Sequence, residues 1–271
     1  MSSPRRLVLS SLALLAALPA ASAPPGRPDR PALTTTGLSP SASVFVLGTA
    51  NNPGLFDSYF TTDVFLVNPN GDGKVAVVVQ AISTVGAVDG QFTVELPPGG
   101  FEVVKNVLGR MGVRGAHVLA IFVDAAASTA DTPSFNAWGY TSTPSKCGPG
   151  DYGVTVPVVT LTSLDAETDG ACVGAEISTG KRTNVGVVNN SAAPLSVTVR
   201  AVDPAKGAVG ELPFDVPPWG FTQISLSNFV SGTLENGALL FRNGTGRYVG
   251  YMVVNDNLSN DALFQVALPD R

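Results

Sequence analysis

The carboxylates of one short acidic run have the clearest potential for chemistry in this sequence. Asp165, Glu167 and Asp169 alternate along the run, Gly170 closes it, and Glu176 follows a little later. They occupy positions 1, 3, 5, 6 and 12 of a calcium-loop pattern, in which carboxylates converge on a hard cation and glycine allows a sharp turn. The spacing therefore predicts a calcium site formed by Asp165, Glu167, Asp169 and Glu176, and it suggests no other cofactor.

An acidic surface turn is the alternative interpretation of the same run. Its flanks, residues 154–161 and 173–178, have the pattern of strands, whereas the usual calcium loop needs helices to aim its last ligand. Residues 51–60, which correspond to this run in the first half of the chain, lack such a cluster, so the fold itself does not require it.

Trp219 is the main candidate for a binding residue. It lies in a Pro-Pro-Trp-Gly-Phe turn, and the corresponding turn of the first half has Gly99 instead, so the shared architecture needs no large ring there. A tryptophan on an exposed loop offers a contact surface to a protein or to the face of a sugar. The alternative is that the ring packs over the end of its own sandwich or against the first half.

His117 is the only histidine, so any Ser-His-acid or Cys-His mechanism depends on it. Alignment of the two halves puts Leu239 in its place, which predicts an ordinary strand residue. The sequence has no Gly-x-Ser-x-Gly elbow, phosphate-binding glycine loop or zinc-protease helix motif. We therefore predict a non-enzymatic protein. The enzymatic alternative is a glycoside hydrolase, whose paired carboxylates need no histidine.

Cys147 and Cys172 are the only cysteines. In an exported chain such a pair is most simply one disulfide, here closing a loop of about 25 residues and adding about 3 kcal/mol of stability. Free thiols and a metal site are the alternatives, but two thiolates need further metal ligands and His117 is distant in the sequence. We predict that a Cys147–Cys172 disulfide fastens the connection between the halves.

Residues 1–23 have the three parts of a secretory signal peptide. Two adjacent arginines give a positive start, an apolar run follows, and small residues ending at Ala23 form the cleavage site, with cleavage after Ala20 or Ala21 as alternatives. The arginine pair also fits a twin-arginine signal, but it is common in ordinary signals. Residues 24–43 follow as a flexible stem rich in Pro, Thr and Ser. The chain is therefore expected to be secreted to the periplasm, the cell surface or the exterior.

Composition excludes several classes of protein. The chain has 271 residues, 44% of them apolar, and a formal charge of -5, which becomes -7 when the signal peptide removes two arginines and no acidic residue. Such a chain is too apolar for a disordered protein, and its charge repels nucleic acids and anionic lipids. The 29 glycines and 21 prolines interrupt elements too often for a helical bundle. No later apolar segment reaches the ~20 residues of a membrane span, so we expect no integral membrane segment in the mature chain.

The two halves of the chain repeat one another. Residues 62–68 match residues 183–189 at an offset of 121, and residues 75–101 match the second half without a gap at an offset of 120. The shared motifs are Thr-(Asp/Asn)-Val before an asparagine turn, an alternating strand, Pro-Pro-x-Gly-Phe and a Gly-Ala strand. A repeat of this length indicates that one structural unit was duplicated.

Period-two patterning predicts that each unit is made of strands. Leu195, Val197 and Val199 alternate with polar residues, as in a strand with one dry and one wet face. Gly and Pro turns at short, regular intervals indicate β-sandwiches.

Short helical turns are expected at residues 106–111 and 226–230. A cluster of Pro and Gly near residue 147 divides the predicted domains, which are a first sandwich at 44–146 and a second at 147–271.

The order of these motifs resembles that of exported bacterial proteins with tandem immunoglobulin-like β-sandwich repeats. The resemblance covers nearly all of the mature chain and rests on structural turns and core positions. It implies an all-β fold of two tandem immunoglobulin-like β-sandwich domains after a signal peptide and a Pro-rich stem. It implies no functional residue, because such families are largely without assigned biochemistry.

Together these features favour a secreted, non-enzymatic β-sandwich protein that acts as a surface, matrix or envelope interaction module. Sandwiches hold their sheets rigid and present loops at both ends, an arrangement that suits recognition. The expected partner is a protein or a glycan. A carbohydrate-binding module is the first alternative function and a glycoside hydrolase is the second.

Overall fold

The computed structural model describes residues 41–54, 57–144, 150–160, 168–243 and 246–269. The chain divides into two units, residues 1–34 and 35–271, and every described residue belongs to the second unit. The predicted signal peptide and most of the predicted stem lie outside the described residues.

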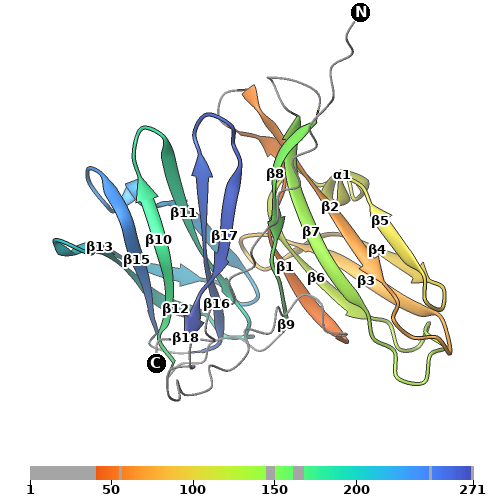
Figure 1. The fold of residues 1–271 in the computed structure, drawn as a ribbon. Coiled ribbons are helices and arrows are strands. Elements are labelled where there is room, and N and C mark those ends of the chain that lie inside the picture. The colour runs from red at the N-terminus through yellow and green to blue at the C-terminus, as the bar shows by residue number, and fades with distance from the viewer. Residues whose placement is uncertain (1–40, 55–56, 145–149, 161–167, 244–245, 270–271) are drawn as a thin grey trace, which may run out of the picture. The chain divides into compact units, whose positions relative to one another are not determined.

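The described residues form an all-β fold of antiparallel strands, which confirms the predicted fold class at this level (Figure 1). We call the first nine strands the first repeat: β1 (Ser43–Pro53), β2 (Tyr59–Val67), β3 (Val75–Ile82), β4 (Val88–Leu96), β5 (Phe101–Val104), β6 (Gly115–Val123), β7 (Asn136–Pro144), β8 (Asp151–Val156) and β9 (Val158–Thr160). We call the other nine the second repeat: β10 (Gly170–Ile177), β11 (Lys181–Asn189), β12 (Leu195–Asp203), β13 (Gly207–Val216), β14 (Phe221–Ser225), β15 (Leu234–Asn243), β16 (Tyr248–Asp256), β17 (Ala262–Val266) and β18 (Leu268–Pro269).

The strand pairing of the first repeat recurs in the second. One layer has the order β4-β3-β6-β1-β9 in the first repeat and β13-β12-β15-β10-β18 in the second. The other layer has the order β5-β2-β7-β8 in the first repeat and β14-β11-β16-β17 in the second. In the first repeat β1 also pairs with β2, which joins the two layers into one nine-stranded sheet. The element order therefore follows the internal repeat of the sequence.

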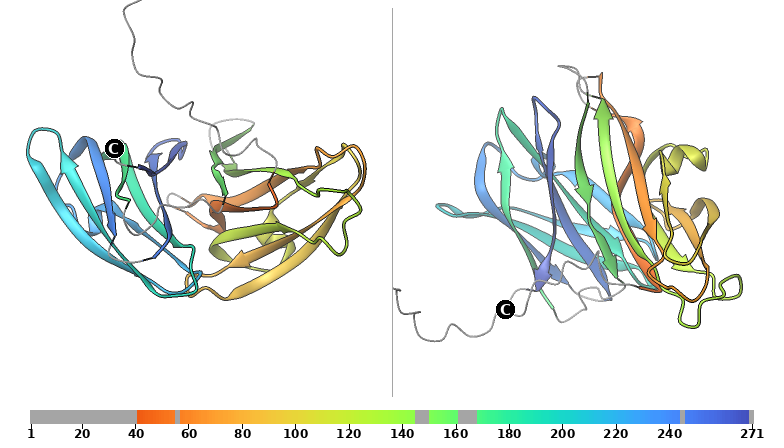
Figure 2. Two further views of the ribbon diagram at one scale, coloured as in Figure 1. Left: turned by 90° about the horizontal axis from the view of Figure 1, so that it is seen from below. Right: turned by 45° about the vertical axis from the view of Figure 1, so that its right-hand side comes forward.

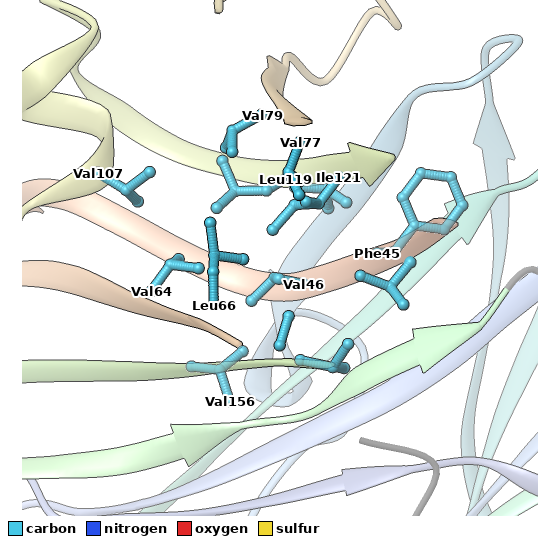
Figure 3. Packing of buried hydrophobic residues seen from close by; sticks show 14 of the residues in the cluster. Phe45, Val46, Val64, Leu66, Val77, Val79, Val107, Leu119, Ile121 and Val156 are labelled. Atoms are coloured by element: carbon cyan, nitrogen blue, oxygen red, sulfur yellow. The ribbon is translucent and has the colours of Figure 1, made fainter. Parts of the chain in front are cut away.

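Alternating apolar residues of the two layers meet in the core of each repeat. Figure 3 shows Val77 and Leu119 of one layer pointing toward Val64 and Leu66 of the other, and all four side chains are fully buried. Because successive side chains of a strand point to opposite faces, the intervening residues form the outer faces of the layers.

Two motifs shared by the repeats fasten the same strands in each. The buried Thr62 accepts a hydrogen bond from the Ala50 N–H (2.8 Å), and Thr183 accepts the equivalent bond from the Glu176 N–H (2.9 Å). The asparagine that follows at the end of the strand, Asn68 or Asn189, is fully buried and bridges two turns with its side chain.

The two predicted helical turns are confirmed. The first is α1 (Val107–Arg110), which the side chain of Asn106 caps by accepting the Gly109 N–H at 3.1 Å. The second is the 3₁₀ turn η2 (Leu226–Asn228).

The strand pairing extends across the predicted borders of the stem and of the first domain. The last residues of the predicted stem take part in strand pairing, because Ser41 forms a bridge with Phe135 and Ser43 starts β1. Strands β8 and β9, which follow the predicted border at residue 147, pair with β7 and β1. The pairing of the first repeat thus extends to Thr160. The predicted border at residue 147 lies outside the described residues, between two strands, β7 and β8, that pair with each other.

The repeats contact each other through the outer face of the β14-β11-β16-β17 layer. Its side chains Val188, Phe221 and Tyr251 belong to the hydrophobic cluster of the first repeat. Strand β17 runs beside β8, where the Gly153 N–H donates to an oxygen of Asp261 at 3.3 Å (Figures 1 and 2).

Candidate functional site

A cavity of about 370 Å³ lies where this outer face meets β1, β2 and β8 of the first repeat. The second repeat lines it with polar side chains on three adjacent strands and the loop that follows: Arg182, Asn184, Gln223, Ser225, Asn255 and Asn260. Aromatic rings form part of the wall: Phe60, Phe221 and Phe264. The cavity therefore combines hydrogen-bonding groups with apolar ring surface.

Strand periodicity explains why the polar groups gather there. Val185 and Val187 of β11 point into the second core, so Arg182 and Asn184 must point the other way. The same alternation in β14 and β16 turns Gln223 and Asn255 outward. The outer face is apolar where it packs on the first repeat and polar where the cavity lies.

Arg182 is held in the cavity wall by neutral groups. Its Nη1 donates to Asn257 Oδ1 at 2.7 Å and its Nη2 donates to Asn260 Oδ1 at 3.0 Å. No carboxylate of the described residues lies within ion-pair distance of the guanidinium. Partial burial lowers the pKa of Arg182, and the nearby charge of Asp256 only partly offsets this. The guanidinium remains charged in solution and has donors left for a ligand.

The loop after β16 places the two asparagines that hold Arg182. The carboxylate of Asp256 accepts the N–H groups of Ser259 and Leu258, each at 2.8 Å, and these bonds lower the pKa of Asp256. A hydrogen bond from the Asn257 N–H to the Gly180 carbonyl (2.8 Å) fixes the loop against β11. The arginine is therefore positioned by a structured turn.

Gln223 is oriented by a buried tyrosine. The Tyr251 hydroxyl donates to Gln223 Oε1 at 2.8 Å, and complete burial raises the pKa of Tyr251, so the hydroxyl stays protonated. With its oxygen engaged in this way, Gln223 keeps its amide NH₂ as a donor for the cavity.

Acceptors are also present in the cavity wall. The Oδ1 atom of Asn52 is buried and has no hydrogen-bond partner among the described residues. The Asn184 side chain, on the opposite wall, forms no hydrogen bond within the same described residues. The Asn184 amide, which lines the cavity, therefore has both its oxygen and its NH₂ group available to a ligand.

His117 is a buried strand residue beside this cavity. Its Nε2 lies 2.9 Å from Asp89 Oδ2, and its Nδ1 has no partner among the described residues. The alignment with Leu239 is wrong by two residues, because Leu239 lies opposite Ala201 just as Leu119 lies opposite Ala81. The pairing makes Gly237 the counterpart of His117, so a side chain at this position is particular to the first repeat.

Trp219 is half exposed, at 46% of its surface. Its backbone has φ +59°, and Gly99 in the corresponding turn has φ +63°. Since non-glycine residues rarely adopt this left-handed conformation, the turn favours glycine, and the tryptophan is held there against a local cost. The exposed ring stays a candidate contact residue at a place apart from the cavity lining.

The acidic run is described only in part. Asp165 and Glu167 lie outside the described residues. Asp169 lies 3.6 Å from the Nε atom of Arg242, and Glu176 accepts a hydrogen bond from Lys181 Nζ at 2.9 Å. Both described members of the predicted calcium site therefore have basic partners of their own, and calcium binding stays a prediction.

Cys172 is a free, buried thiol, so the structure does not contain the predicted disulfide. Cys147 lies outside the described residues. Cys172 points into the second core at the position that Val46 occupies in the first repeat, opposite Leu239 and Leu119 respectively. It fills this position as a small apolar side chain.

The burial of Cys172 predicts low reactivity. Burial raises the pKa of this thiol to about 12, which leaves almost no thiolate near neutral pH. In a Cys147→Ser variant, we expect a thiol-specific reagent to label Cys172 only after unfolding in denaturant, as measured by intact mass. Rapid labelling of the native variant, or a disulfide between the two cysteines in the native wild-type protein, would contradict this prediction.

Sequence reasoning did not identify Arg182, Gln223 or Asn52. Part of the signal was present, because Arg182 and Asn184 lie two residues apart on the strand that contains the valines of the repeat motif. Two polar residues in that register indicate an outer face with its own function. Which groups of the first repeat lie opposite Arg182 and Asn184 depends on how the two repeats pack together. The residue pattern of a single strand contains no information about that packing.

Comparison with known proteins gives no assignment. No protein-family model matches the sequence, and no curated protein matches it either. Within the described ranges, no helix has both the length and the apolar character to cross a membrane.

Proposed function

We propose that this chain is a secreted, non-enzymatic protein of two tandem immunoglobulin-like β-sandwich domains that acts as a surface, matrix or envelope interaction module. The observation that supports it best is the cavity between rigid β-layers, with Arg182 held by amide groups alone. The cavity offers an arginine and the side-chain amides of Gln223 and Asn184. Such an arrangement binds a ligand without needing a nucleophile or a general base.

The composition of the wall favours a carbohydrate as the ligand. Sugars present many hydroxyl groups, which both donate and accept hydrogen bonds, and apolar C–H faces, which pack on aromatic rings. Arg182, Gln223 and Asn184 supply the polar partners, and Phe60 and Phe264 supply ring surface. A volume of about 370 Å³ lies within the range of small-molecule sites.

Co-sedimentation with bacterial envelope and extracellular-matrix preparations tests the interaction function. We expect the wild-type protein to pellet with one of these preparations and the Arg182→Gln variant to remain largely in the supernatant. Arg200→Gln is the matched control, because Arg200 pairs with Glu211 on an exposed sheet face. Equal pelleting of Arg182→Gln and wild type would reject the cavity as the binding site.

An array of neutral and uronic-acid-bearing oligosaccharides tests the carbohydrate ligand. We expect retention of the wild-type protein and at least a tenfold loss for Arg182→Gln, about 1.4 kcal/mol of binding free energy. A Trp219→Ala variant separates the two candidate surfaces. Loss of binding in Trp219→Ala with full binding by Arg182→Gln would move the site to the exposed turn, and no retention of the wild type would reject a carbohydrate ligand.

A further inference from the structure

The two repeats meet through surfaces that are not equivalent. The second repeat contributes the outer face of β14, β11 and β16, where Phe221 is 3% exposed and Tyr251 is fully buried. The first repeat contributes, among other groups, a bulge in β1, where Leu47 is fully buried and Gly48 approaches Phe264. Because the two repeats are built alike, each repeat also contains a counterpart of the surface that the other contributes. This counterpart takes no part in the internal contact.

The first repeat has a more exposed copy of this outer face. Phe101 corresponds to Phe221, because both begin the strand after the Pro-Pro-x-Gly turn and pair with the last valine of the neighbouring strand. Trp138 corresponds to Tyr251, since they lie opposite Phe65 and Gly186, which are themselves equivalent. We call Phe65, Phe101 and Trp138 the aromatic face.

Exposure distinguishes the two copies of this face. Phe101 is 72% exposed, whereas its counterpart Phe221 is 3% exposed. Phe65 and Trp138 stack with their ring centroids 5.0 Å apart and are half-buried, with Trp138 packed against the hydrophobic cluster of the first repeat, whereas the Tyr251 ring is fully buried. Apolar surface of this kind on a protein typically marks a contact site.

The second repeat has an uncovered copy of the bulge. Val173 and Gly174 follow Cys172, which lies opposite Leu239, just as Leu47 and Gly48 follow Val46, which lies opposite Leu119. Both glycines have positive φ, +62° at Gly48 and +87° at Gly174. We call Val173 and Gly174 the bulge surface.

This bulge also differs from its counterpart in exposure. Val173 is 62% exposed, whereas Leu47 is fully buried. A Cβ atom on Gly48 would lie 2.6 Å from the Phe264 ring, whereas a Cβ atom on Gly174 would meet no atom within 4 Å. Each chain therefore presents two surfaces, the aromatic face and the bulge surface, whose counterparts are buried in its internal contact.

We propose that the aromatic face of one chain docks on the bulge surface of a second copy of the same chain. The proposed contact brings together, between molecules, the counterparts of two surfaces that take part in the contact between the repeats, except that Thr155 stands in the first repeat where the second has Phe264, the ring that Gly48 meets. The contact is heterologous, because its two sides differ. An assembly of any length therefore has a free aromatic face at one end and a free bulge surface at the other. Copies then associate head to tail into open chains.

The contact between copies is weaker than the internal one. The internal contact includes Gly86, where any side chain would collide with the Pro218 carbonyl, and the corresponding residue of the second repeat is Lys206. The intermolecular contact therefore omits this hairpin and depends on the aromatic face and the bulge surface. We expect association to be reversible and dependent on protein concentration.

Sedimentation velocity across a concentration series tests the proposal on the mature protein. We expect the weight-average mass of the wild type to rise continuously with concentration. Phe101→Ser and Val173→Ser each remove one side of the contact and should leave monomers. Leu258→Ser is the matched control, since Leu258 is 92% exposed but belongs to neither surface, and it should associate like the wild type.

Mixing the two variants distinguishes this contact from other modes of association. The Phe101→Ser protein keeps the bulge surface and the Val173→Ser protein keeps the aromatic face, so the mixture should form a dimer and stop there. Thermal melts of each variant alone establish that it is folded. A wild type that is monomeric at every concentration, or a mixture of folded variants that stays monomeric, would overturn the proposal.

Discussion

Replacing Asn189 with alanine is expected to lower the free energy of unfolding by about 3 to 4 kcal/mol. Its fully buried side chain donates from Nδ2 to the carbonyls of Ala193 (2.8 Å), Pro217 (3.0 Å) and Val216 (3.2 Å). Its Oδ1 accepts the Ser191 N–H at 2.9 Å. Alanine removes all of these bonds, leaves buried backbone groups unpaired, and opens a small cavity. Urea unfolding followed by circular dichroism measures the loss.

Asn136→Ala is the matched control for this prediction. The Oδ1 atom of Asn136 is buried without a partner among the described residues, so its removal should change stability by less than about 1 kcal/mol or increase it. Asn68→Ala should behave like Asn189→Ala, because Asn68 makes the equivalent bonds to Gly73, Leu96 and Pro97. An Asn189→Ala variant as stable as Asn136→Ala would show that the network contributes little.

This asparagine shows why the internal repeat could be recognised from the sequence. The residues that define the repeat are those whose local chemistry is obligatory: a buried threonine, an asparagine that pairs several backbone groups, and a Pro-Pro-x-Gly turn. Each of them leaves its mark within a few residues of sequence. The alternation of Val75, Val77 and Val79 similarly records burial on one face of a single strand. These signals need no knowledge of distant contacts.

Features that depend on distant pairing were missed. The Pro-Gly cluster near residue 147 has the composition of a domain linker, but β7 before it and β8 after it are paired strands. A turn between paired strands and a linker between domains use the same residues, so composition alone does not separate them. The disulfide prediction for Cys172 is wrong for a similar reason, because the sequence shows two cysteines but not that one of them points into a core.

The candidate site was the least predictable feature. Its polar residues are common surface types, and only the packing of one repeat on the other turns them into a cavity wall. Arg182 stands where the first repeat has Thr61, and Gly186 stands where it has Phe65. These differences between otherwise equivalent positions distinguish the cavity wall of the second repeat from the corresponding face of the first.

Gly186 gives the second prediction, that alanine at this position costs about 2 to 3 kcal/mol of stability. A Cβ atom on Gly186 would collide with the ring of Tyr251, which is fully buried and stacks on Phe264 with centroids 5.1 Å apart. The ring would have to move, which would break its hydrogen bond to Gln223 and disturb the cavity wall. We therefore expect Gly186→Ala to unfold at a lower urea concentration than wild type.

A double-mutant cycle shows that the collision is the cause. In a Tyr251→Leu background the smaller side chain leaves room for the new methyl group, so Gly186→Ala should cost at least 1 kcal/mol less there than in the wild-type protein. Gly71→Ala is the control for replacing a glycine as such, because a Cβ atom on Gly71 meets nothing within 4 Å. An equal cost of Gly186→Ala in both backgrounds would contradict the explanation. In that case the second repeat would tolerate a side chain at this position, and the contrast between Phe65 in one repeat and glycine in the other would need another cause than the packing of Tyr251.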